Sequence, residues 1–162
     1  MAAVEDILRS YRRPRVVIRD HLARMRSEPR LFSFLFSALL LMFVAQWPAL
    51  ARQHFQTPDV PMPGLFLGTA LALAATTPFF YALAFLVTQA TRLFRGRGDG
   101  YGGRLALFWA LFAVSPLMLL QGLTQGMIGP GPQANAVAAV VFAVFAVIWA
   151  AGLRVTQFEG RT

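Results

Sequence analysis

Four long apolar runs without ionisable side chains dominate the chain. They cover about residues 31–51, 65–91, 105–128 and 134–153. Each approaches or exceeds the ~20 residues that a helix rising 1.5 Å per residue needs to cross a ~30 Å hydrocarbon core. A buried helix in a soluble protein can resemble one such run, but not four in series. The pattern therefore predicts an all-α fold, a polytopic transmembrane bundle of about four helices within residues 31–154.

Glycine and proline mark the connections between these runs, at about residues 52–64, 92–104 and 129–133. The glycines around Asp99 indicate a flexible loop, because neither a preceding strand nor the GK[ST] ending of a phosphate-binding loop is present. Pro78 and Pro116 fall inside the second and third runs, where proline removes a backbone donor and favours a kink, either for packing or as a hinge. Small residues in 65–70 and 134–151 favour close approach of helices.

The first 30 residues form a basic segment of a different kind. Their apolar positions recur at spacings of three and four in two groups, and Pro14 between the groups predicts two short amphipathic helices. Three interpretations remain open: an orientation signal that also packs on the bundle, a docking surface for a partner protein, and a contact with anionic lipid headgroups at the cytoplasmic face. The candidate contact residues are Arg9, Arg12, Arg13, Arg15 and Arg19.

The distribution of positive charge predicts the orientation. The formal net charge is +8, and all 15 basic residues are arginine. With four crossings, every arginine except Arg52 lies on the same side, which the positive-inside rule assigns to the cytoplasm. Both termini, including the tail at 155–162, are therefore expected in the cytoplasm, with the first run acting as an uncleaved anchor. Because topology accounts for this charge and no nucleic-acid-binding motif accompanies it, no nucleic-acid partner is predicted.

Candidate catalytic chemistry is sparse. The chain has no cysteine, which excludes thiolate nucleophiles and cysteine-based metal or cluster sites. The predicted topology puts His21 and His54 on opposite sides of the membrane, so they cannot share a metal ion. His21 is expected to form a surface pair with Asp20. We predict no catalytic residue, no cofactor and no metal site, and hence no enzyme.

Four glutamines lie within the apolar runs, and they are the candidate interhelical polar residues: Gln46, Gln89, Gln121 and Gln125. Hydrogen bonds between helices account for such side chains at about 0.6–2 kcal/mol each. If the four instead formed one water-accessible line, they would favour a path for an uncharged solute.

Three segments carry a resemblance to a known family. They are residues 43–48 (FVAQWP), 101–111 (YGGRLALFWAL) and 115–120 (SPLMLL). They resemble bacterial members of the Yip (Ypt-interacting protein) family, of the short alphaproteobacterial type. The resemblance implies a multi-pass domain of the bacterial inner membrane with a cytoplasmic N-terminal segment, and it supplies no activity.

Two functions are consistent with these features. The first is a non-catalytic accessory or assembly subunit of a larger membrane complex, whose partner is a membrane protein or a second copy of the chain. The alternative is a small oligomeric channel or carrier for an uncharged or lipid-like solute.

Overall fold

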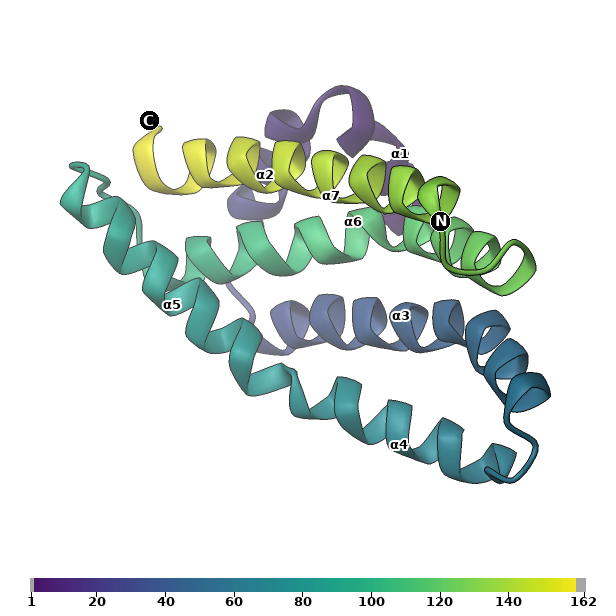
Figure 1. Ribbon diagram of the computed structural model, residues 1–162. Helices are drawn as coiled ribbons and strands as arrows, with labels where there is room; N and C mark the ends of the chain where they lie inside the picture. The colour runs from purple at the N-terminus through teal and green to yellow at the C-terminus, as the bar shows by residue number, and fades with distance from the viewer. Residues whose placement is uncertain (1, 160–162) are drawn as a thin grey trace.

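The computed structural model describes residues 2–159, which fold into helices joined by short turns and loops (Figure 1). In chain order these are α1 (Ala2–Arg12), α2 (Pro14–Ala23), α3 (Glu28–Gln56), α4 (Met62–Ala75), α5 (Thr77–Leu93), α6 (Gly100–Met127), α7 (Pro132–Leu153) and the π-helical turn η1 (Arg154–Phe158). No strand occurs in residues 2–159, so the all-α prediction is confirmed.

Four helical segments are long and apolar enough to cross a membrane. They are α3, α4 with α5, α6, and α7 with η1, and they contain 29, 32, 28 and 27 residues. Even the shortest is about 40 Å long, which exceeds the ~30 Å hydrocarbon core. The chain is therefore a multi-pass membrane protein, and the four predicted runs coincide with these segments.

Side-chain caps set the first residue of two spans. Ser27 precedes α3, and its Oγ accepts a hydrogen bond from the Arg30 amide at 3.4 Å. Asp99 precedes α6, and its Oδ1 accepts from the Gly102 amide at 2.9 Å. Each cap satisfies a backbone donor that the first turn of a helix leaves without an intrahelical partner. The glycine-rich loop predicted to be flexible thus ends in a fixed cap for α6.

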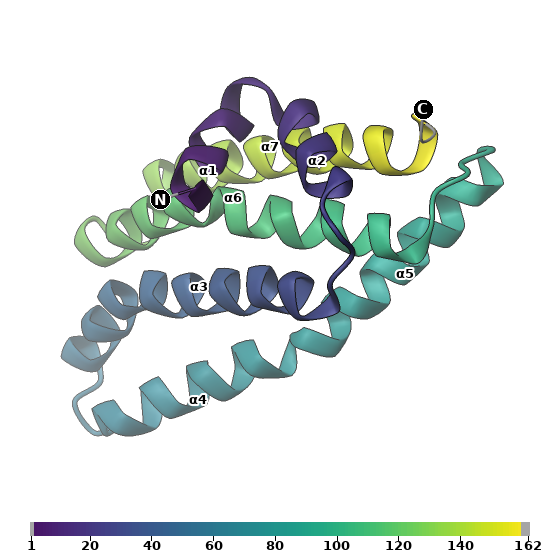
Figure 2. The same ribbon diagram turned by 180° about the vertical axis from the view of Figure 1, so that it is seen from behind.

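Helix α6 lies between α3 and α7 in both views of the bundle (Figures 1 and 2). A Cβ atom added to Gly122 of α6 would lie 1.8 Å from the Ala45 carbonyl oxygen of α3. On the other side, a Cβ added to Gly152 of α7 would lie 3.1 Å from the Ala106 Cβ of α6. The backbones therefore approach closely at small residues, which is the typical way for membrane helices to pack.

The two prolines predicted to kink their helices have different effects. Near Pro78 the second span breaks at Thr76, and Pro78 lies in the first turn of α5, where its missing N–H is tolerated. Pro116, by contrast, lies within an uninterrupted α6. Its missing N–H would leave the Phe112 carbonyl without a partner, but Ser115 Oγ donates to that oxygen at 2.7 Å.

Helix α4 diverges from the rest of the bundle (Figures 1 and 2). None of its residues is buried. Its contact with α3 includes the ring of Phe66, which meets those of Phe43 and Trp47 at centroid distances of 6.2 and 5.7 Å. Helix α5 then returns to the start of α6, where Thr88 lies against Gly103. The second span is thus held at its two ends and open along α4.

Helices α1 and α2 form an N-terminal hairpin, separated at Arg13 and Pro14 as predicted. The hairpin packs on the side of α6 and α7, where Val17 and Ile18 join a buried cluster with Trp109. Tyr11 Oη donates to the Ala113 carbonyl at 2.7 Å. Ala113 is nine residues beyond Arg104, so the hairpin contacts α6 about 14 Å along that helix from Arg104. Of the three interpretations of this segment, the structure thus supports packing on the bundle. Docking of a partner protein and contact with lipid headgroups stay open for its exposed face.

Candidate functional site

The five candidate contact arginines lie on the exposed side of the N-terminal hairpin, and acidic residues of the chain itself engage three of them. Arg9 lies 3.5 Å from both Asp6 and Asp20. Arg19 Nη2 donates to Glu159 Oε2 at 2.5 Å, and Arg15 lies 3.7 Å from the other oxygen of that carboxylate. The Arg9 pairs join α1 to α2, and the two pairs with Glu159 fasten the hairpin to the residue that follows η1.

Arg12 and Arg13 differ from the other three arginines, because no ion pair within residues 2–159 involves them. Both side chains are exposed at the turn of the hairpin. They line a cavity of about 650 Å³ together with Glu5, Leu8, Arg9 and Tyr11, so basic, acidic and apolar groups all face it. Contact of the five arginines with lipid or with a partner protein stays a prediction.

His21 is not the surface partner of Asp20 that we expected. It is buried, with 3% of its surface exposed, and its ring centroid lies 4.3 Å from that of Trp109. Burial and the nearby Arg24 lower the pKa of His21 to about 4, whereas Asp6 acts in the opposite direction. The ring is therefore neutral at pH 7, and its 3.8 Å approach to Asp6 is not an ion pair at that pH.

The burial of His21 follows from helical spacing, which can be read from the sequence. On a helix, neighbours in sequence do not face each other, whereas residues three and four apart do. His21 follows Ile18 by three and Val17 by four, which places it on the buried face of α2. Its spacing, rather than its neighbour Asp20, predicts its environment.

Buried polar contacts connect the N-terminal hairpin to α6. Trp109 Nε1 donates to Ser10 Oγ at 3.0 Å, and Ser10 Oγ donates to the Asp6 carbonyl oxygen at 2.8 Å. Ser10 and Trp109 are both fully buried. Because an unpaired polar group in this environment would be destabilising, the contacts fix the hairpin in one position on α6.

The four candidate interhelical glutamines do not come together. Gln46 and Gln89 are exposed on α3 and α5, and Gln121 and Gln125 are half-buried on α6. Among residues 2–159, the side-chain hydrogen bonds that join different helices come from other residues, including Ser10, Tyr11 and Gln157. The glutamines therefore do not form one polar line through the interior.

One face of α4 presents small residues that no other helix contacts closely. Its members recur at spacings of three and four: Gly64, Gly68, Ala72 and Ala75. All four are exposed. A Cβ added to Gly68 would meet no atom within 4 Å, whereas one on Gly126 of α6 would lie 2.2 Å from Pro48 Cβ. Gly122 and Gly126 of α6 are thus covered by α3, and Gly68 of α4 is covered by no other helix.

Comparisons with known proteins identify no relative. No family model matches the chain, and neither a curated protein nor a solved structure is significantly similar to it. The resemblance to the Yip family stays a prediction.

Proposed function

We propose that this chain is a non-catalytic accessory or assembly subunit of a larger complex in the bacterial inner membrane, and that it joins its partner through α4. The observation that carries the proposal is the open small-residue face at Gly64 and Gly68. In a membrane, helices associate through close packing at such residues, since lipid tails are as apolar as leucine side chains. The same chain uses glycine in this way at Gly122, which touches α3.

The proposed orientation places both termini in the cytoplasm. Its support is that arginines gather where α3, α6 and η1 begin and where α5 ends. Arg26 pairs with Asp99, Arg104 pairs with Glu28, and the Arg97 amide donates to the Gln157 carbonyl at 2.8 Å, so these segments lie together. The opposite end of the bundle carries Arg52. This asymmetry agrees with the positive-inside rule.

No observation favours the channel or carrier, because the glutamines that would line its path lie on separate and partly outward-facing surfaces. The subunit proposal is tested by purifying the tagged full-length chain from its native membrane at native abundance in a mild detergent. Mass spectrometry then identifies what remains bound. We expect one membrane-protein partner in a fixed ratio.

Two substitutions to leucine on α4 test the face itself. Gly68→Leu fills the open face and should abolish co-purification. Ala74→Leu adds a leucine at an exposed alanine (about 120° from the centre of that face at 100° per residue) and should leave it unchanged. A wild-type chain that purifies alone, as a monomer or as a homo-oligomer, would overturn the subunit proposal. Retention of the partner by Gly68→Leu would exclude α4 as the interface.

A further inference from the structure

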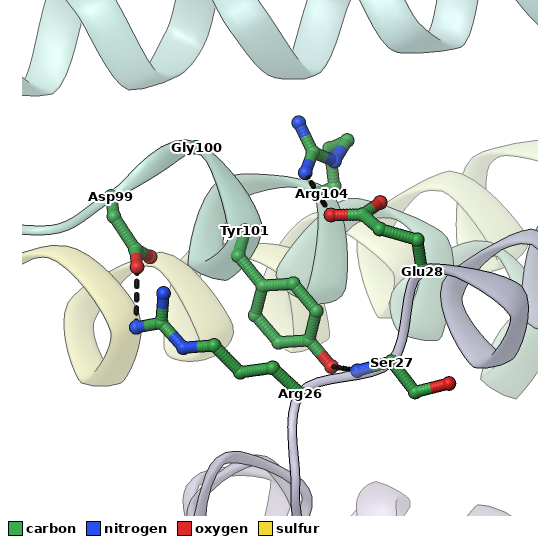
Figure 3. A pocket seen from close by; sticks show the side chains of 7 residues that line it. All are labelled: Arg26, Ser27, Glu28, Asp99, Gly100, Tyr101 and Arg104. Atoms are coloured by element: carbon green, nitrogen blue, oxygen red, sulfur yellow. Dashed lines mark hydrogen bonds and ion pairs between the residues drawn. The ribbon is translucent and has the colours of Figure 1, made fainter.

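A cavity of about 400 Å³ lies at the arginine-rich end of the bundle, where α3 and α6 begin (Figure 3). The loop between α2 and α3 forms one wall, and the first turn of α6 forms the other. The residues that line it are Arg26, Ser27, Glu28, Asp99, Gly100, Tyr101 and Arg104. Because two membrane spans begin here, the cavity lies at the depth of the lipid headgroups.

The cavity contains two charges of each sign. Arg26 Nη2 lies 2.5 Å from Asp99 Oδ2, and Arg104 Nη2 lies 2.5 Å from Glu28 Oε1 (Figure 3). Between the two pairs stands Tyr101, whose Oη accepts a hydrogen bond from the Ser27 amide at 3.2 Å. Burial would raise the pKa of Asp99, but the hydrogen bond from its capped amide and the Arg26 guanidinium lower it. The Asp99 carboxyl group is therefore ionised at neutral pH.

This arrangement selects the charge of a ligand. A lone anion would face two carboxylates, and a lone cation would face two guanidinium groups. A molecule with a phosphate and an ammonium group can satisfy both, the phosphate on the arginines and the ammonium on the carboxylates. The existing ion pairs are partly exposed, and such pairs contribute only about 0–1 kcal/mol. They can exchange partners with a ligand at small cost.

One further feature favours a ligand that is also a lipid. Below the cavity an exposed apolar ridge follows α3 from Glu28 at intervals of four residues. It consists of Phe32, Phe36 and Leu40, which are 50%, 55% and 52% exposed. From Glu28 to Leu40 the ridge extends about 18 Å, close to the ~15 Å depth of one hydrocarbon leaflet.

We propose that this cavity binds the headgroup of a zwitterionic phospholipid with a primary ammonium group, of the phosphatidylethanolamine type, with one acyl chain along the Phe32–Phe36 ridge. The guanidinium groups of Arg26 and Arg104 hold the phosphate. The carboxylates of Glu28 and Asp99 accept hydrogen bonds from the ammonium group. A quaternary ammonium group has no N–H to donate, and a phosphatidylglycerol headgroup has no cation.

Native mass spectrometry of the full-length chain tests this site. The detergent-purified protein is mixed with equal amounts of phosphatidylethanolamine, phosphatidylcholine and phosphatidylglycerol that carry the same acyl chains. We expect the first lipid to be retained about tenfold more than either of the others, which corresponds to one charge-assisted hydrogen bond. Equal retention of the three lipids would overturn the proposal. So would equal competition by soluble glycerophosphoethanolamine, because that result would remove the role of the acyl chain.

Variants assign the effect to the cavity. The double substitution Glu28→Gln and Asp99→Asn removes both carboxylates but keeps an N-cap residue before α6. It should abolish the preference for the ethanolamine lipid, whereas Asp59→Asn, in an exposed loop at the other end of the bundle, should leave it intact. If the double variant fails to fold, Glu28→Gln alone carries the test, since its side chain is 59% exposed. An unchanged lipid preference in a folded carboxylate variant would overturn the proposal.

Discussion

At the residue scale, His21 shows how one ionisable side chain couples the N-terminal hairpin to the membrane bundle. Its ring packs against both Trp109 and Phe34, at centroid distances of 4.3 and 5.4 Å. Burial, Arg24 and Arg30 all oppose its protonation, while Asp6 and Asp20 favour it. The balance lowers the pKa from 6.5 to about 4, so folding favours the neutral ring.

The stability of the chain should therefore fall in acid. The unfolded chain binds a proton at His21 below pH 6.5, whereas the folded chain resists it until about pH 4. Full stabilisation is present above pH 6.5 and is lost as the pH falls toward 4, by roughly 3 kcal/mol. Thermal unfolding in detergent across this range measures the loss. His21→Phe should flatten the profile and His54→Phe should not; the same slope in His21→Phe would contradict this account.

At the element scale, Ser115 explains how α6 continues without interruption past an intramembrane proline. Pro116 deprives the Phe112 carbonyl of its usual donor, and the Ser115 hydroxyl supplies another one at 2.7 Å. Near Pro78 the helix breaks instead, and Thr76 Oγ1 donates to the Leu73 carbonyl at 2.6 Å. Only at Pro116 does the hydroxyl replace the donor that the proline removes, because the Leu73 carbonyl also accepts from the Thr76 amide at 3.0 Å.

The role of Ser115 predicts a coupling that a double-mutant cycle can measure. Ser115→Ala should destabilise the chain by about 1–2 kcal/mol, because the Phe112 carbonyl is left buried without a donor. In a Pro116→Ala background the restored N–H binds that carbonyl, so the same Ser115→Ala change should have an effect near zero. Reversible unfolding of the four variants gives the coupling energy. Equal effects in both backgrounds would show that Ser115 does not compensate for the proline.

The sequence predicts these elements better than their irregularities. Runs of apolar residues longer than a membrane is thick leave little alternative to a helix, so the four spans follow directly. The effect of a proline depends on a hydroxyl one or two residues away and on the neighbouring helix, which hydropathy does not encode. The sequence therefore predicts a kink at both Pro78 and Pro116, although the helix is interrupted only near Pro78.

At the scale of the whole molecule, the sequence predicts the number of spans but not the neighbours of each span. An amphipathic helix with an arginine face suits a lipid surface and a protein surface equally well. Only the folded chain shows that Ile18 packs beside Trp109. The cavity lined by Arg26, Asp99 and Arg104 could not be predicted from the sequence either. Glu28 and Arg104 are 76 residues apart and meet only because α3 and α6 start at the same level.

The proposed orientation makes a prediction for the whole molecule that is unusually easy to check, because the chain has no native cysteine to remove. Single cysteines at Asp59, at Arg97 and at Gln133 in the first turn of α7 report on the three connections between spans. In spheroplasts, a membrane-impermeant maleimide should label Asp59→Cys and Gln133→Cys, whereas Arg97→Cys should react only after permeabilisation. The physical reason is that the arginine-rich end resists translocation, so the connection with Arg97 stays in the cytoplasm.

The reverse labelling pattern would mean that the bundle has the opposite orientation in the membrane. Labelling of Asp59 and Gln133 from opposite sides would mean that only one of the second and third spans crosses the membrane, and the headgroup cavity could then no longer be assigned to the cytoplasmic leaflet.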